Sequence, residues 1–497
     1  MKRTFQFLGI ALLGLLAVLI ARTLLLAPPL LSASDPELPE GIRAEVIARH
    51  LGQAVRFQTI AQQVGASEAQ QASSRTAFAD MQAWLLQTYP LLAANTRLEV
   101  IGAGSLLFTW AGSDPLLDPV LLMAHMDVVP IAPGEDSKWQ YPPFSGELAD
   151  GYVWGRGTLD TKGSMIAMLE AAELLLQQGF KPARSVLFSL GADEEIGGYN
   201  GNRLVAQHLQ QQGIKLAWVS DEGGAITRGM IPGVSANVAL IGIAEKGSVT
   251  LNVTASAVGG HSSMPQPFDQ TAIGRLSLSL QQIGHNPFAA HIQGPTNDLL
   301  DTIAPAQAFL PRIVLANRWL FGPLITKMLE SSAAGSAQLR TVIAPTIING
   351  GNKENVLPPD ARAIINLRIH PADSIESVQQ HVKAAVNDPQ VSIKIMPGAR
   401  EPSGISDVTG EAYRHLSQTI RDSFGNTLVA PNLTVVGTDS RYFLPLTENV
   451  FRFAPIHLTQ QDTQRIHGLN ERIAVKDLAA AAAFYYRLIS TMPAQPD

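Results

Sequence analysis

The sequence predicts an α/β fold in which a larger domain, built on a mostly parallel sheet flanked by helices, carries a smaller inserted α+β domain. Short, nearly continuous apolar runs that end in acidic residues alternate with helical stretches; the runs are PVLLMAHMD, SVLFSLGADEE and KLAWVSDE. This pattern is typical of a sheet covered by helices on both faces. The chain has 497 residues, which exceeds the size at which a single hydrophobic core stops growing, so we expect two domains.

Residues 1–35 have the pattern of a membrane-targeting segment followed by a linker. Lys2 and Arg3 precede an uncharged apolar run over residues 5–21. This run lies near the lower length limit for crossing a bilayer and is long for a signal-peptide core. The nearest cleavage motif, at residues 31–33, has a leucine where a small residue is preferred. We favour an uncleaved signal-anchor that leaves the rest of the chain outside the cytoplasm; a cleaved signal peptide, giving an exported or secreted protein, and a buried helix are the alternatives.

The larger domain is expected over residues 36–243 and again over residues 403–497. Apolar residues recur at helical spacing from Ile42 to Val55, which predicts a first helix. After residue 403 the sequence predicts a helix at GEAYRHLSQTIRDSF, a turn at residues 437–441 and a final helix at AVKDLAAAAAFYYRLIS. Ligands of such sheets bind beyond the carboxyl ends of the strands. The Asp, Glu and His residues of this sequence follow the predicted strands at those ends.

The smaller domain is expected over residues 244–402. GSVTLNVTASAV alternates in the strand manner, ENVLPPDARAIINLRIHP predicts a turn and a strand, and DSIESVQQHVKAAVND predicts a helix. This domain also contains a long apolar stretch, LLDTIAPAQAFLPRIVLANRWLFGPLITKMLESSAAG. Arg312, Arg318, Lys327 and several prolines interrupt the stretch, so it does not predict a membrane span. Core packing, a dimer contact, a channel for an acyl chain and a bilayer contact all remain open for it.

Composition excludes some function classes. The net charge of −6 and the absence of a dense Lys/Arg cluster argue against a nucleic-acid partner. The chain has no cysteine, so no disulfide stabilises the fold and any metal site must consist of histidine and carboxylate ligands.

Five short segments carry the strongest functional signal: AHMD (residues 124–127), RGTLDTKG (156–163), ADEEIGG (192–198), SDEGG (220–224) and RIHGLNE (465–471). A pair of divalent cations needs about five histidine and carboxylate ligands and a further carboxylate that moves protons. The candidate ligands are His125, Asp160, Glu195, Asp221 and His467, and the candidate base is Glu194. Each segment alone is compatible with a solvated turn or a structural histidine, but their joint occurrence favours a two-metal site.

Local spacing adds detail to three of these segments. His125 and Asp127 are two residues apart and share a strand face, so Asp127 is suited to hold the imidazole in one orientation. Asp160 follows glycines that let the backbone bend tightly, and the segment lacks the GK[ST] ending of a phosphate-binding loop. Glu194 and Glu195 are adjacent at a predicted strand end, so their side chains diverge and one is free to bind metal while the other faces the substrate.

Seven motifs together resemble one known family: HMDVVP, GRGTLDTKG, DEEIGG, SDEGG, GGHSSMP, NKENVLPPDARAIINLR and GTDSR. They resemble the two-zinc metallopeptidase family twenty, which contains carboxypeptidase S, glutamate carboxypeptidase and the aminoacylases. The resemblance covers nearly everything after about residue 40. It is greatest to the carboxypeptidase S branch, which includes the N-fatty-acyl-amino-acid synthase/hydrolase. It implies a zinc-peptidase catalytic domain with an inserted lid/dimerisation domain.

The resemblance also implies the roles of the metal-site residues. One zinc ion would take His125, Asp160 and Asp221, and the other would take Asp160, Glu195 and His467. A hydroxide between the two ions would be the nucleophile and Glu194 the general base, with Asp127 supporting His125. Some relatives use a glutamate in the SDEGG segment, so Glu222 is a rival to Asp221. The ligand types also suit other divalent ions.

The inserted domain would supply the remaining site residues. His261 resembles the family histidine that steadies the developing oxyanion, often from the partner subunit of a dimer, so a homodimer is one implied arrangement. Asn355 and Arg368 match positions that grip the substrate, and Gly437 would line the same pocket. A bidentate arginine suits a free carboxylate; a cross-strand ion pair is the alternative for Arg368.

These observations predict a zinc-dependent hydrolase that cleaves the amide bond of N-acyl amino acids or of short peptides with a free carboxylate. A broad dipeptidase or carboxypeptidase of the same family is the first alternative. A non-catalytic binding protein on the same fold is the second, and the presence of Glu194 argues against it, because a binding module has no use for a free base beside the metals.

Overall fold

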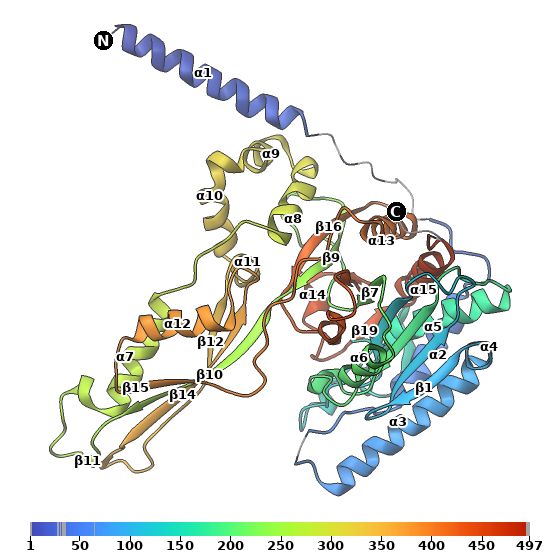
Figure 1. The fold of residues 1–497 in the computed structure, drawn as a ribbon, viewed down its shortest axis with the longest axis horizontal. Coiled ribbons are helices and arrows are strands. Elements are labelled where there is room, and N and C mark those ends of the chain that lie inside the picture. The colour runs from blue at the N-terminus through green and yellow to red at the C-terminus, as the bar shows by residue number, and fades with distance from the viewer. Residues whose placement is uncertain (1, 27–28, 30, 32–35, 64, 494–497) are drawn as a thin grey trace.

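The computed structural model describes residues 2–26, 29, 31, 36–63 and 65–493, and two sheets organise it (Figure 1). The larger sheet has ten strands in the order β1-β2-β6-β3-β7-β17-β9-β8-β18, with β16 beside β9. Its strands are β1 (Arg97–Ile101), β2 (Ser105–Trp110), β3 (Val120–His125), β6 (Val186–Gly191), β7 (Trp218–Asp221), β8 (Ile226–Thr227), β9 (Asn237–Glu245), β16 (Thr427–Thr434), β17 (Val450–Arg452) and β18 (His457–Leu458).

The centre of this sheet is parallel. β3 pairs in parallel with both β6 and β7, and β7 pairs in parallel with β17. Every residue of β3 and β6 is buried, as expected for strands that helices cover on both sides. The register places His125 opposite Gly191, so the carboxyl ends of β3 and β6 coincide. The predicted α/β class and the mostly parallel sheet are therefore confirmed.

Helices cover both faces of the larger sheet. Alternate residues of β3 separate the two cores: Leu122 and Ala124 pack with α2, α5 and α15, whereas Leu121 and Met123 pack with α6. The helices of the larger body are α2 (Ala44–Arg56), α3 (Glu68–Thr88), α4 (Pro90–Asn95), α5 (Lys162–Gln177), α6 (Asn202–Gln211), α13 (Glu411–Ser423), α14 (Gln460–Thr463) and α15 (Val475–Ser490). A three-stranded sheet of β4 (Glu147–Ala149), β5 (Tyr152–Trp154) and β19 (Arg472–Ala474) joins the C-terminal segment to the start of the Asp160 loop.

The smaller sheet is antiparallel, in the order β12-β14-β10-β15. Its strands are β10 (Gly247–Ser256), β12 (Val342–Gly350), β14 (Asp360–Ile369) and β15 (Val391–Ile395), and two helices pack on it, α7 (Ala272–His285) and α12 (Ile375–Val386). Strand β10 alternates buried and half-buried residues, which is the pattern of a sheet with one covered face. A short pair, β11 (Gly260–His261) with β13 (Val356–Leu357), lies at the far end of this small domain from β7 (Figure 1).

The long apolar stretch forms four helices: α8 (Pro295–Ile303), α9 (Phe309–Ala316), α10 (Arg318–Glu330) and α11 (Ala333–Leu339). The sequence places this stretch within the small domain. In the structure its buried side chains, Leu300, Ile303 and Ile325, instead pack with Val238 of β9 and Leu428 of β16. The stretch therefore covers an end of the larger sheet, because β9 and β16 present an apolar face there.

The N-terminal segment forms α1 (Lys2–Leu24), which runs outward from the rest of the molecule (Figure 1). By length and composition, its part from Thr4 to Leu24 is able to cross a membrane, and a signal sequence passes the same test. Most of its side chains are exposed, but Leu19 and Thr23 are buried where α1 meets α9.

Candidate metal centre

The predicted ligands meet beyond the carboxyl ends of the central strands, as expected for a parallel sheet. His125 ends β3, and Glu194 and Glu195 open a short 3-10 helix that follows β6. Asp160 precedes α5, and His467 lies in the loop before β19. Four segments that are far apart in the sequence thus deliver side chains to one edge of the sheet.

Asp160 is the centre of this cluster. One carboxylate oxygen, Oδ1, lies 2.9 Å from His125 Nε2, and the other, Oδ2, lies 3.0 Å from His467 Nε2. His467 Nε2 also lies 3.1 Å from Glu195 Oε2. Ligand atoms of His125, Asp160 and Glu195 all lie within 4.8 Å of one another. A carboxylate that faces a different imidazole with each oxygen has the geometry of a bridging ligand between two cations.

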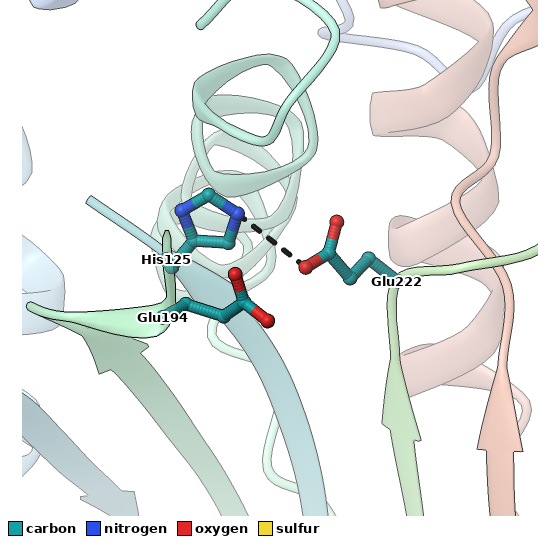
Figure 2. Close-up of side chains that lie close together, drawn as sticks. All are labelled: His125, Glu194 and Glu222. Atoms are coloured by element: carbon teal, nitrogen blue, oxygen red, sulfur yellow. Dashed lines mark ion pairs between the residues drawn. The ribbon is translucent and has the colours of Figure 1, made fainter. Parts of the chain in front are cut away.

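The structure brings Glu222 rather than Asp221 next to His125. Glu222 Oε1 lies 3.4 Å from His125 Nε2 (Figure 2), and His125, Glu194 and Glu222 form a second group able to hold a metal ion. Asp221 is buried and accepts a hydrogen bond from the backbone N–H of Ser440 at 2.8 Å. Adjacent side chains at a strand end diverge, and Glu222 is the one of the two acids that pairs with His125. This geometry favours Glu222 over Asp221 as a metal ligand.

Asp127 fixes the surroundings of His125 and Glu194. Its fully buried carboxylate accepts the backbone N–H groups of Glu194 at 3.1 Å and of Glu195 at 3.0 Å. Its backbone carbonyl lies 2.9 Å from His125 Nδ1, and its carboxylate lies 3.4 Å from the same nitrogen. These contacts favour the tautomer that carries the proton on Nδ1 and leaves Nε2 free for a metal ion.

The charges of the cluster fit divalent cations. Burial, and then the neighbouring carboxylates of Glu222 and Asp439, raise the pKa of Glu194 well above its usual range. Burial and the charge of Asp160 raise the pKa of Glu222 to about 8. Like charges held together away from water disfavour ionisation, and a bound cation relieves that repulsion. Imidazole and carboxylate donors are also the ligand types of catalytic zinc sites.

Glu471 is a structural residue of the site that the sequence did not reveal. Its buried carboxylate accepts the backbone N–H groups of Gly157, Leu159 and Asp160, at 3.0, 2.8 and 3.3 Å, and the guanidinium of Arg156 at 2.7 Å. Arg156 in turn donates to the backbone carbonyl of His467 at 3.1 Å. Glu471 therefore holds the Asp160 loop and the His467 loop together. The sequence feature that could have identified Glu471 is its position four residues after the candidate ligand His467.

His467 lies in the left-handed backbone region, with φ of 58°. Residues other than glycine rarely adopt this conformation. Such an unfavourable backbone conformation persists only where contacts with the surrounding structure hold it in place. The hydrogen bond from Arg156 to the His467 carbonyl supplies part of that support. The hydrogen bonds of Nε2 to Asp160 and Glu195 raise the pKa of His467 to about 10.

His261 and Asn355 lie next to each other but away from the metal ligands. His261 is exposed on β11, where its Nδ1 accepts the backbone N–H of Ser263 at 3.1 Å. The backbone carbonyl of Asn355 accepts the N–H of Ser262 at 3.2 Å. No contact joins either residue to the metal ligands in the described part of the chain, and Figure 1 shows β11 remote from α5 and β7. The structure thus does not bring these two predicted residues to the site.

Arg368 and Gly437 belong to a cationic cluster where the two sheets meet. A side chain at Gly437 would place its Cβ 1.9 Å from Arg400 Nη2, so glycine makes room for this arginine. Burial, and then the positive charges of Arg441 and Arg368, lower the pKa of Arg400, and the negative charge of Glu245 only partly opposes them. Glu245 lies 3.9 Å from Arg400. The sequence interpretation missed Arg400 because no motif contains it.

Comparisons with known proteins identify the family of this chain. The model of peptidase family M20/M25/M40 matches residues 121–491. The chain is 39% identical over 489 residues to the N-fatty-acyl-amino acid synthase/hydrolase of Xenopus tropicalis, which covers 97% of this chain and 93% of that protein. It is 38% identical over 445 residues to a carboxypeptidase S-like protein of Dictyostelium discoideum, which covers 89% and 84%.

A solved structure shares the fold. The M20 family metallo-carboxypeptidase from Sulfolobus solfataricus superposes with a TM-score of 0.62 at 17% identity, over 89% of this chain and 98% of that one. The predicted family and branch are confirmed by the sequence relatives. The chain belongs to the peptidase family M20/M25/M40, and it is a hydrolytic enzyme.

Proposed function

We propose that this enzyme uses two divalent metal ions to cleave the amide bond of N-acyl amino acids, or of short peptides, that carry a free carboxylate. The observation that carries the proposal is the position of Asp160 between His125 and His467, with Glu194 beside them. The relatives add support, because one is named an N-fatty-acyl-amino acid synthase/hydrolase and another a probable carboxypeptidase S-like protein.

The ligand sets follow from the distances. His125, Asp160 and Glu222 would hold one cation, with Glu222 in the place that the sequence analysis assigned to Asp221. Asp160, Glu195 and His467 would hold the other. Zinc suits this donor set. The bound ions would polarise the scissile carbonyl and lower the pKa of the attacking water.

Glu194 is the proposed proton carrier. It belongs to one of the two groups of candidate ligands, and its carboxylate points into the space between His125 and Glu222 (Figure 2). A raised pKa makes the Glu194 carboxylate a stronger base toward the attacking water than an ordinary carboxylate, and the acid formed in that step then donates the proton to the leaving nitrogen. The hydrogen bond from its backbone N–H to Asp127 holds the residue in place.

The cationic cluster is the proposed site for the free carboxylate of the substrate. Arg368 and Arg400 bring guanidinium groups that are able to hold a carboxylate in bidentate fashion, and Lys246 and Arg441 add positive charge. Glu245 balances only part of this charge, because it also pairs with Arg452 at 3.1 Å. Gly437 contributes the open space beside Arg400.

The acyl side of the substrate has space beside Glu195. A cavity of about 670 Å³ lies there, and its wall includes Ile60, Val128, Pro130, Gln62 and Ser74. An acyl chain suits the apolar part of this wall, and a peptide suits the amide and hydroxyl groups. The mixed lining keeps a broad dipeptidase or carboxypeptidase as the second candidate.

His261 and Asn355 would act after the small domain has moved, or from a second copy of the chain. His261 is exposed and remote from the cluster in this conformation. The reaction nevertheless needs a hydrogen-bond donor at the substrate's carbonyl oxygen, where negative charge develops in the transition state. Strand β12 is largely exposed at the edge of its sheet, which leaves a surface for a homodimer. Both arrangements belong to the proposal.

The apolar helix α1 supports a membrane anchor, with the catalytic body on the extracytoplasmic side. The contact of Leu19 and Thr23 with α9 favours an uncleaved helix, because the globular body retains a binding place for it. An exported protein results if the segment is cleaved.

One assay separates the two substrate classes. Matched N-acyl amino acids and dipeptides with the same carboxyl-terminal residue are incubated with the purified full chain, and the products are quantified by liquid chromatography with mass detection. We expect cleavage of the N-acyl amino acids. Cleavage of the dipeptides alone would identify a peptidase, and cleavage of neither class by the metal-loaded enzyme would contradict the proposed function.

A further inference from the structure

Helices α9 and α10 expose an apolar surface that nothing in the described part of the chain covers. We name this surface the α9–α10 patch and define it by Phe309, Leu310, Trp319, Leu320, Leu324 and Met328. Trp319 is 58% exposed and Met328 is 62% exposed. Ile325 is the buried residue of α10, and α9 has none. A concentration of large exposed apolar side chains marks an interaction surface.

The patch has the pattern of an interfacial helix. Leu320, Leu324 and Met328 recur every four residues, so they form one stripe along α10. Pro323 lies within the same helix, and the exposed Lys327 adds a positive charge beside the stripe. Helices that lie in the bilayer interface combine an apolar stripe with basic residues and tryptophan.

The patch is continuous with α1. The guanidinium Nε of Arg22 donates to the backbone carbonyl of Ala316 at 3.3 Å, and Asn317 Nδ2 donates to the carbonyl of Leu19 at 3.2 Å. Asn317 is the residue that joins α9 to α10. Figure 1 shows the C-terminal end of α1 passing over α9. The point where α1 would leave the membrane is therefore the point where it meets the patch.

A cavity at this junction has the chemistry of the headgroup region. Its volume is about 460 Å³, and Arg22, Arg318, Trp319, Leu25 and Leu315 line it together with Asp301. Arg318 pairs with Asp301, whereas Arg22 has room for an anion. Arginine and tryptophan side by side next to apolar residues suit the boundary between lipid headgroups and acyl chains.

We propose that the α9–α10 patch lies in the surface of the bilayer that α1 crosses, with its apolar side chains among the upper acyl chains. This inference rests on the proposed membrane anchoring. It adds that the catalytic body is held at a fixed place on the membrane, with α8 joining the patch to the strands β9 and β16. Amphiphilic substrates concentrate at the same surface.

Single-cysteine labelling tests this, because the natural chain has no cysteine. Nitroxide labels are placed in the full chain at Leu324→Cys in the patch, at Leu12→Cys in α1 and at Val258→Cys in the small domain, where Val258 is 73% exposed. The chain is reconstituted into vesicles of phosphatidylcholine and phosphatidylglycerol. Collision rates with oxygen, which enriches in lipid, and with a water-soluble nickel chelate are then measured by electron paramagnetic resonance.

We expect the labels at positions 12 and 324 to collide more with oxygen and the label at position 258 to collide more with nickel. A lipid-like result at position 12 with a water-like result at position 324 overturns the proposal that the patch lies in the bilayer surface and leaves the anchor intact. A water-like result at position 12 contradicts the anchor and, with it, the proposal that the patch lies in the bilayer that α1 crosses. Spin–spin broadening at position 324 without oxygen enrichment would show that a second copy covers the patch, which also overturns the proposal.

Discussion

Glu194 is the residue on which the proposed chemistry depends most. Its half-buried carboxylate lies near those of Glu222 and Asp439, and the loss of water together with these charges raises its pKa. The proposed metal ligands all come from other residues. The proposal therefore assigns proton transfer and metal binding to different side chains of the same cluster, and a substitution is able to separate the two roles.

Replacing Glu194 with glutamine keeps the size of the side chain and removes the proton acceptor. We expect kcat to fall by about 10²–10⁴-fold, the usual contribution of a general base, while the metal content of the protein stays the same. Steady-state kinetics and elemental analysis of the same sample measure both quantities. Wild-type turnover in Glu194→Gln would rule out this role.

Glu222 and Asp221 give a matched pair of variants. Glu222→Gln is expected to weaken the binding of one cation by at least roughly tenfold, since even residues that only support a ligand cost that much. Asp221→Asn retains an oxygen for the N–H of Ser440 and is expected to keep both ions. Competition with a chelator measures the affinities. The opposite pattern, with loss in Asp221→Asn alone, would restore Asp221 as the ligand.

At the scale of elements, Glu471 connects the loop before α5 to the loop before β19. Glu471→Ala leaves the buried Arg156 without its carboxylate and three backbone N–H groups without an acceptor. Removing one partner of a buried ion pair lowers the free energy of unfolding by about 3–5 kcal/mol. Denaturant unfolding measures this loss, and Glu471→Gln, which keeps an oxygen, should lose less. Equal stability of all three proteins would contradict the connecting role.

The end of β14 carries a group that responds to acid. His370 is buried, and burial together with the charge of Lys246 lowers its pKa from 6.5 to about 4. Its Nδ1 accepts the backbone N–H of Ala372 at 3.1 Å. Between pH 6.5 and 4 the unfolded chain binds the proton that the folded protein refuses, so the stability contributed by neutral His370 falls as the pH falls through this window.

His370→Asn tests that prediction, because asparagine offers an oxygen for the same N–H and does not titrate. Urea unfolding at pH 7 and at pH 4.5 should show a smaller loss of stability on acidification in the variant than in the wild type. An identical loss in both proteins would mean that His370 is not the group responsible.

The sequence predicted the elements with the simplest patterns. The apolar runs that became β3 and β6 are buried on both faces, so their composition alone indicated their place. The choice between Asp221 and Glu222 depends on which way the chain turns at the end of β7, and two adjacent acids give no sign of this. The apolar stretch that became α8 to α11 was expected within the small domain, and its buried side chains pack with β9 and β16 of the larger sheet, because helical spacing does not identify the sheet that a helix covers.

For the whole molecule, the five segments that carry the candidate ligands could be identified from the sequence, because the residue types and their order along the chain are visible without coordinates. The relation between the small domain and the cluster was not predictable in the same way. His261 and Asn355 lie together on the small domain, as their motifs implied, yet remote from the cluster. The distance of these two residues from the cluster depends on the angle between the small domain and the larger domain, which local sequence does not encode.

The central claim, that two metal ions and Glu194 form one hydrolytic site, is tested by titrating metal-free enzyme with zinc. Turnover of an N-acyl amino acid is followed as a function of zinc bound per chain. We predict that turnover rises with added zinc and levels off at about two ions per chain, the number that the two ligand sets on Asp160 would hold. Full turnover by the metal-free protein, or a plateau that does not depend on bound metal, would contradict the account.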